Sequence, residues 1–375
     1  MSWTPGMATR YRRRRRRHDT GVRRPPRRRI PNVRDAALLI RGKPLSAVRQ
    51  SLEAYCREAG HSGPLRGFAL TRYGHGYSLS SLAGSNASHL AEVIALGLIG
   101  RVALVRLPLT ADRLRVKNGI RVFFEPAAAG ARPLTAKIAL PSAHRTGSLA
   151  REIAARQALV PATSGRFALP RIHRKDTTGA VWFEEDFIAT GAAGEDQKVA
   201  LFLGELAARI YRPGIASVPL AEALAQTGTG DAEIAALHDL PPAARQFPDA
   251  TFTVSRIHGD LAPANMILGR DGRLYLIDWE LSVQAPIACD LKKLFPYDRP
   301  GVLRLLDDLR RPGDAGARDQ MRLALCCQLA GLRRDRDKRL SYLTSNRNKS
   351  LRKALALVAR QEKELLAWIT ELATP

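Results

Sequence analysis

Residues 253–280 read TVSRIHGDLAPANMILGRDGRLYLIDWE, and this stretch carries the clearest local signals in the chain. Two short apolar runs, Met266–Leu268 and Leu274–Ile277, flank the sequence GRDG. An Asp-Gly pair between apolar runs is a strong local signal for a β-hairpin. The hairpin would bring the preceding loop, His258–Asn265, close to Asp278, which directly follows the second strand.

Three polar side chains would then meet beside this hairpin. Asp260 and Asn265 lie on the loop, and Asp278 lies just past the second strand. Such carboxylate and amide oxygens suit Mg²⁺, which proteins usually hold through one or two carboxylates together with substrate phosphates. One carboxylate remains to take a proton from an attacking hydroxyl group. Phosphoryl transfer from ATP requires this division of roles.

Length and composition indicate a globular protein with more than one domain. The chain has 375 residues, of which 45% are hydrophobic and 25% are charged, as in ordinary globular proteins. No apolar run approaches the ~20 residues of a membrane-spanning helix. The Arg-rich start is not followed by the longer apolar core of a signal peptide. We therefore expect a soluble, cytoplasmic protein.

The formal charge of +25 is unevenly distributed along the chain. Residues 1–30 contain twelve arginines and one aspartate. Such a segment cannot bury apolar area, so we predict a disordered arm. The arm is either a solvated tail or a contact to nucleic acid or an anionic membrane, without sequence specificity. The basic surface as a whole favours anionic partners and disfavours a polycationic substrate.

The rest of the chain divides into three parts. Residues 31–100 form an N-terminal extension of uncertain fold, with two predicted helices, one after Pro44 and one after Ser88. Residues 101–189 alternate strands with one amphipathic helix, and residues 190–375 are mainly helical. The strands are expected at 101–108, 119–125, 134–140, 167–172 and 180–188, and the helix at 148–159. This order indicates an α+β fold, in which a small antiparallel sheet with one main helix precedes a larger helical lobe.

From about residue 100 to 330, the chain resembles the aminoglycoside phosphotransferase and choline kinase family, which has a bilobal protein-kinase-like fold. HGDLAPAN, at 258–265, is similar to the catalytic loop H-G-D-x-x-x-x-N of that family. IDWE, at 277–280, is similar to its metal-binding element I-D-[WF]-[ED]. The resemblance implies a kinase that transfers the γ-phosphoryl group of ATP to a small-molecule hydroxyl. We expect the acceptor to be a sugar, a lipid head group or a polysaccharide precursor.

The resemblance also implies roles for single residues of the catalytic loop and the metal site. Asp260 would be the catalytic base or would orient the acceptor hydroxyl. His258 would act beside it, more by orienting the loop than by carrying a proton. Asn265 and Asp278 would bind the Mg²⁺ ions at the ATP phosphates.

Further roles are implied for residues 101–189 and for one residue beyond them. Lys137 would meet the α- and β-phosphates and would pair with Glu152 of the predicted helix. The segment Phe183–Phe187, with Glu185 and Phe187, would be the hinge whose backbone contacts adenine. Its acidic side chains could instead simply face solvent. Asp290 would hold the catalytic loop in place.

The element that covers the ATP phosphates is not assigned by the sequence. Members of the family often have a Gly-rich hairpin there, but the expected loop, Thr110–Asn118, has only one flanking glycine, Gly119. Gly84–Asn86 resembles the G-x-S-N turn of the family but precedes a predicted helix.

Two alternative functions therefore remain for the protein. One is a catalytically silent, kinase-like nucleotide-binding protein. The other is a protein that acts through its basic arm on nucleic acid or an anionic surface.

Overall fold

The computed structural model describes residues 45–73, 76–82, 87–108, 111–116, 120–124, 133–139, 143–343 and 349–374. All of these residues belong to one unit of the chain, Lys43–Pro375. The arm predicted at 1–30 and the segment Gly84–Asn86 lie outside the described residues. Within the described part, no helix combines the length and the apolar character needed to cross a bilayer.

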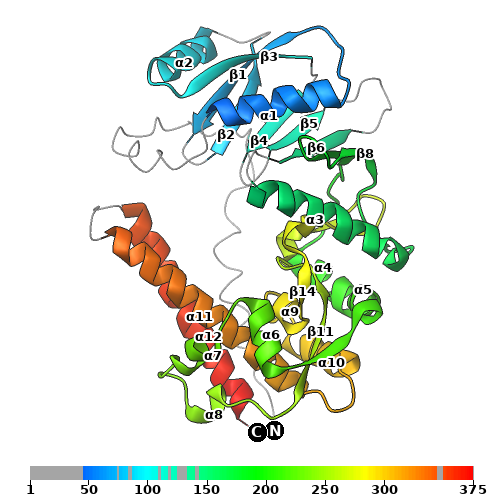
Figure 1. Ribbon diagram of the computed structural model, residues 1–375, viewed down its shortest axis with the longest axis vertical. Coiled ribbons are helices and arrows are strands. Elements are labelled where there is room, and N and C mark those ends of the chain that lie inside the picture. The colour runs from blue at the N-terminus through cyan, green and yellow to red at the C-terminus, as the bar shows by residue number, and fades with distance from the viewer. Residues whose placement is uncertain are drawn as a thin grey trace. The chain divides into compact units, whose positions relative to one another are not determined.

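An antiparallel sheet forms the first half of this unit (Figure 1). Its eight strands follow the order β3-β1-β2-β4-β5-β6-β9-β8. Their bounds are β1 (Arg66–Tyr73), β2 (Gly76–Ser81), β3 (Val102–Leu107), β4 (Ala111–Val116), β5 (Ile120–Phe124), β6 (Leu134–Ile138), β8 (Ile172–Asp176) and β9 (Trp182–Asp186).

The sheet contains strands that the sequence did not predict. β1 and β2 come from a Gly- and Ser-rich stretch that was not predicted to form strands. The predicted strand at 101–108 is present as β3, and it pairs with β1 at the sheet edge. Most of the expected loop Thr110–Asn118 is strand β4, and the turn at 117–119 lies outside the described residues. Strand formation depends on cross-strand neighbours more than on intrinsic preference. The residues of β1, β2 and β4 therefore gave little indication of a strand when each stretch was read alone.

Three helices accompany the sheet: α1 (Leu45–Glu58), α2 (Ala87–Leu98) and α3 (Ala143–Leu159). α1 buries Val48, Leu52 and Tyr55, which recur at helical spacing and lie on one face of the helix. This face packs against Phe68 and other buried residues of the sheet. α1 thereby lies against β1 and β3, as Figure 1 shows.

The remaining residues form a mostly helical lobe with two small sheets. β10 (Ala216–Pro219), β11 (Thr251–Ile257) and β14 (Val283–Pro286) form one sheet, and β12 (Met266–Leu268), β13 (Leu274–Leu276) and β7 (Phe167–Ala168) form the other. The helices are α4 (Glu195–Leu201), α5 (Ala207–Tyr211), α6 (Leu220–Thr227), α7 (Asp231–Ala235), α8 (Pro242–Arg245), α9 (Ala288–Leu291), α10 (Arg299–Leu309), α11 (Ala317–Leu343) and α12 (Lys349–Ala373). The last two lie side by side (Figure 1).

The predicted hairpin is confirmed. β12 and β13 pair antiparallel, with Met266 opposite Leu276 and Leu268 opposite Leu274. The turn between them contains Gly272 at a φ of +76°, a conformation that glycine adopts without steric cost. β13 also pairs in parallel with β7, so the hairpin is joined to the chain that follows α3.

Gly259, just before Asp260, has no room for a side chain. Its φ is +82°, and an added Cβ would lie 2.8 Å from the carbonyl carbon of Leu281. Leu281 ends the short 3₁₀ helix Trp279–Leu281, which directly follows Asp278. The close approach of these two backbones therefore sets the distance between the loop His258–Asn265 and the segment that follows Asp278.

We predict that Gly259→Ala destabilises the protein by several kcal/mol, because it adds an overlap with backbone to the ~1–2 kcal/mol of a left-handed alanine. Gly272→Ala is the matched control, since its φ is similar and nothing lies within 4 Å of its added Cβ. Urea unfolding of both variants measures the difference. Equal losses would show that the contact with Leu281 does not constrain the loop.

Glu184 on β9 joins the sheet to α1 through a buried set of hydrogen bonds. Its carboxylate accepts a hydrogen bond from Tyr55 at 2.6 Å and two from Arg174 at 2.7 Å. Burial alone would raise the pKa of Glu184, but hydrogen bonds from His61, Arg174 and Tyr55 outweigh it and lower the pKa to about 2. The expected alternative, that the acidic residues of this segment face solvent, is wrong for Glu184, which is buried.

The lowered pKa predicts an acid-sensitive contribution to folding. A carboxylate whose folded-state pKa falls from 4.5 to about 2 stabilises the fold above pH 4.5 and loses this effect as the pH falls toward 2. Glu184→Gln should therefore lower the free energy of unfolding at pH 7, and its difference from the wild type should shrink by pH 3. Glu53→Gln, at an exposed residue paired with Arg49 on α1, should change little at either pH. A pH-independent difference for Glu184→Gln would contradict the prediction.

Candidate active site

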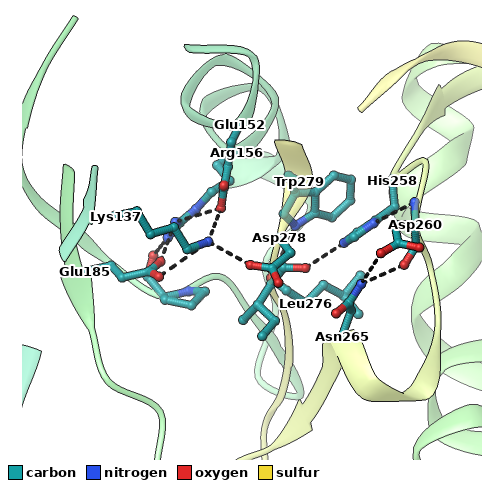
Figure 2. A network of polar contacts seen from close by, with 12 residues as sticks. Lys137, Glu152, Arg156, Glu185, His258, Asp260, Asn265, Leu276, Asp278 and Trp279 are labelled. Carbon is teal, nitrogen blue, oxygen red and sulfur yellow. Dashed lines mark hydrogen bonds and ion pairs between the residues drawn. The ribbon is translucent and has the colours of Figure 1, made fainter. Parts of the chain in front are cut away.

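Lys137 on β6 is the centre of a buried ion network (Figure 2). Its Nζ lies 2.5 Å from Glu152 Oε1 on α3 and 3.0 Å from Asp278 Oδ1 after β13. Glu185 Oε1 on β9 is 3.6 Å away. The network therefore brings together the predicted Lys137–Glu152 pair and the predicted metal ligand Asp278. The sequence separation of Lys137 and Asp278 is 141 residues.

A second cation, Arg156 on α3, completes the network and was not predicted. Its Nη1 donates to Glu185 Oε2 at 2.6 Å. The same Nη1 lies 3.8 Å from Oε1 of Glu152, which precedes Arg156 by one helical turn. Arg156 also donates to the carbonyl oxygen of Pro170. Burial raises the pKa of Glu152, and the charges of Lys137 and Arg156 oppose this rise. Glu152 and Arg156 are four residues apart, a helical spacing that could have indicated a shared face.

The loop His258–Asn265, which was predicted to be catalytic, is held mainly through backbone contacts. His258 is buried, its ring packs on Trp279, and its Nε2 lies 2.8 Å from the carbonyl oxygen of Ile277. The other ring nitrogen accepts from the backbone N–H of Asp260 at 3.3 Å. Both nitrogens of His258 are thus engaged by backbone groups of the loop and of the hairpin end.

Asp290 on α9 fixes the start of the same loop. Its carboxylate accepts from the backbone N–H groups of His258 at 2.5 Å and Gly259 at 2.8 Å, and from the Tyr211 hydroxyl at 3.1 Å. Burial raises the pKa of Asp290, while the hydrogen bonds from the backbone N–H groups of His258 and Gly259 and from Tyr211 oppose the rise. These contacts are those of a residue that holds the loop rather than one that meets a substrate.

Asp278 stands in an unusual backbone conformation. Among the described residues it is the only non-glycine with a positive φ, 69°, and such residues are held by the surrounding structure at a cost in energy. The backbone N–H of Ile277, the preceding residue, donates to the carbonyl oxygen of Asn265 at 3.1 Å. The left-handed conformation turns the Asp278 carboxylate toward Lys137, as seen in Figure 2.

The donor set fits a magnesium ion that is shared with phosphate oxygens. Asn265 Nδ2 donates to the Asp260 carbonyl oxygen at 2.8 Å and to Asp260 Oδ2 at 3.1 Å, which leaves the amide oxygen of Asn265 as its acceptor atom. The described residues contain no cluster of three or more His, Cys, Asp or Glu side chains that could hold a metal alone. In the buried network, the formal charges of Lys137 and Arg156 face those of three carboxylates. Asp278 of this network and Asn265 supply the carboxylate and amide oxygens that suit Mg²⁺.

The predicted hinge lines a small cavity. Glu185 and Phe187 lie on its wall together with Lys137 and Asp278, and its volume is about 90 Å³. The backbone N–H of Phe187 donates to the carbonyl oxygen of Pro133 at 3.0 Å. The Glu185 side chain is buried in the ion network rather than exposed to solvent. The segment predicted as the hinge therefore lines this cavity, but the sequence did not indicate that Glu185 binds Arg156.

Lys293 is the site residue that sequence reasoning missed. Its ammonium group forms an ion pair with Asp260 Oδ1. Lys293 lies two residues after the end of α9 and three residues after Asp290. The sequence DLKK at 290–293 offered a signal, since Asp290 was expected at the loop, but a lysine pair there is usually a solvated surface feature.

No curated protein matches this sequence significantly. Solved structures that are similar to the chain include the macrolide 2'-phosphotransferase of Brachybacterium faecium, with 14% identity and a TM-score of 0.41, covering 65% of this chain and 89% of that one. The choline kinase of Streptococcus pneumoniae has 13% identity and a TM-score of 0.41, covering 68% and 91%. A choline/ethanolamine kinase family protein of Mesorhizobium loti has 16% identity and a TM-score of 0.38, covering 67% and 89%.

The sequence profile of the phosphotransferase enzyme family matches residues 8–337, which is most of the chain. The predicted fold class, α+β and protein-kinase-like, is confirmed by this match together with the antiparallel sheet, the helix α3 and the helical lobe. The prediction of an enzyme that phosphorylates a hydroxyl group is likewise confirmed at the level of the family. This chain belongs to the phosphotransferase enzyme family.

Proposed function

We propose that this enzyme transfers the γ-phosphoryl group of ATP to a hydroxyl group of a small molecule, with Mg²⁺ as cofactor. One observation carries the proposal. Lys137 contacts Glu152 and Asp278 at the same time, so a cation from the sheet and an acidic residue from the hairpin meet in one place. An assembled network of this kind favours an active kinase over the silent nucleotide-binding alternative.

The chain's own residues divide the work in this proposal. Lys137, held by Glu152, contributes positive charge toward the nucleotide phosphates, and the segment Glu185–Phe187 borders the adenine. Asn265 and Asp278 hold the metal, which when bound neutralises charge on the phosphate oxygens. His258 acts as a positioning residue, because both of its nitrogens are occupied by backbone groups.

Asp260 receives the acceptor. Its side chain is 44% exposed, whereas Lys137 and Glu152 are almost completely buried. An acceptor hydroxyl can therefore reach the Asp260 carboxylate from solvent, be oriented by it and pass its proton to it. The catalytic loop keeps this carboxylate in place through the hydrogen bond from Asn265.

The surroundings of Asp260 bear on the class of acceptor. The positive charge of Lys293 sits directly at this carboxylate, where an ammonium group of a polycationic acceptor would meet repulsion. A neutral or anionic acceptor meets no such repulsion from Lys293. We therefore propose a sugar, a lipid head group or a polysaccharide precursor as the acceptor, rather than an aminoglycoside.

We predict that Asp260→Ala abolishes phosphoryl transfer but leaves nucleotide binding intact, because Asp260 faces the acceptor and not the ion network. Asp278→Ala should instead remove the Mg²⁺-dependent part of ATP affinity. ADP release measures the first effect, and calorimetric titration with ATP in the presence and absence of Mg²⁺ measures the second.

Asp249→Ala is the control for both variants, since Asp249 is an exposed aspartate a few residues before the loop. It should match the wild type in both measurements. Near-full turnover by purified Asp260→Ala would refute the assignment of the catalytic residue. Unchanged Mg²⁺ dependence in Asp278→Ala would refute the metal site.

A screen of acceptors tests the substrate class. ADP release should be stimulated by neutral or phosphorylated sugars, lipid head groups or polysaccharide precursors, with Asp260→Ala as the blank. Kanamycin and choline serve as cationic comparisons, and we expect little turnover with either because of Lys293. Faster turnover with these cations than with every neutral or anionic compound would contradict the proposed class.

A further inference from the structure

The carboxylate of Asp260 is held from two sides, and only one of them belongs to the catalytic loop. Oδ2 accepts from Asn265 at 3.1 Å, while Oδ1 forms the ion pair with Lys293. The Lys293 side chain is 37% exposed, and that of Asp260 is 44% exposed. An ion pair with this exposure contributes little to folding stability. Folding alone therefore does not explain why a lysine is placed here.

The position of Lys293 follows from the anchoring of the loop. Asp290 and Lys293 are three residues apart where α9 ends, so they lie on the same side of one turn. Asp290 binds the backbone N–H groups of His258 and Gly259. The same turn then presents Lys293 to the next side chain of the loop, Asp260. The loop and the ammonium group are thus positioned by one short segment.

Simple geometry places this ammonium group close to the reacting atoms. An acceptor oxygen must lie about 2.6–3.2 Å from the Asp260 carboxylate to be oriented by it. Charge-assisted N–H···O hydrogen bonds are about 2.7–2.9 Å long, so Lys293 Nζ lies within roughly 6 Å of an acceptor oxygen bound at Asp260 Oδ1. Lys137 is deeply buried on the opposite side of Asp278, with Glu152. It therefore cannot serve the acceptor side in the same way.

We propose that Lys293 is a catalytic residue that stabilises the negative charge of the phosphoryl group during transfer. This inference rests on the proposed function. In the step, a bond forms between the acceptor oxygen and the γ-phosphorus, and the bond from this phosphorus to the β,γ-bridging oxygen breaks. The electron pair of that bond stays on ADP, and the acceptor proton passes to Asp260. Lys293 neutralises charge on the equatorial oxygens of the transferring group, where preorganised cations are most effective.

The test compares two ligands that require no knowledge of the acceptor. MgADP occupies the nucleotide site alone, whereas MgADP with aluminium fluoride adds a planar anion that imitates the transferring phosphoryl group. Calorimetric titration gives the dissociation constant for each, and their ratio is the gain in affinity from the anion. The variants are Lys293→Met, Lys293→Arg and, as matched control, Lys292→Met, which removes the neighbouring lysine charge.

Lys293→Met should bind MgADP as the wild type does but lose roughly a hundredfold or more of the gain from aluminium fluoride, the scale of losing one preorganised donor. Lys293→Arg should keep most of the gain, and Lys292→Met should keep all of it. An unchanged gain in Lys293→Met would overturn the inference. So would an equal loss of affinity for both ligands, which indicates a structural role.

The wild type provides the separate check on the proposed function. If it fails to bind MgADP at all, the proposed nucleotide site is wrong and Lys293 loses its role with it. If it binds MgADP but gains nothing from aluminium fluoride, the role of Lys293 is overturned, while the nucleotide site stands.

Discussion

A buried ammonium group imposes the main constraint on this enzyme. Lys137 is almost completely removed from solvent, and a lone buried charge would be strongly unfavourable. Its neighbours Glu152, Asp278 and Glu185 offset that cost. Each of them lies on a different segment, α3, the hairpin end and β9. Satisfying one charge therefore joins the sheet, its main helix and the catalytic hairpin in a single arrangement.

The second buried cation extends this constraint to the hinge. Arg156 binds Oε2 of Glu185, while Lys137 lies near Oε1 of the same carboxylate. Glu185 is therefore shared between two cations. Glu184, its neighbour on β9, points to the other side of the strand and binds Tyr55 of α1. Alternate side chains of one strand thus connect the ion network with the N-terminal helix. The segment before residue 100 is in this way part of the support for the site.

The acceptor side depends on a different anchor. Asp290 holds the backbone of the catalytic loop, and the same turn of chain brings Lys293 to Asp260. Gly259 lets the loop approach Leu281 more closely than any residue with a side chain would allow. The proposed nucleotide side is therefore fixed by buried charge, and the proposed acceptor side by backbone hydrogen bonds and close backbone packing.

Local sequence was sufficient to predict the hairpin, because turn chemistry acts over a few residues. It also indicated Asp260, Asn265 and Asp278 as candidate site residues through their short spacings. It also indicated Lys137 and Glu152, through the family resemblance. Tertiary structure alone decided that β1 and β2 extend the sheet, that Arg156 binds Glu185, and that Lys293 reaches Asp260. These features depend on strand pairing and on charges brought together from distant segments, and neither leaves a periodic pattern in one stretch of sequence.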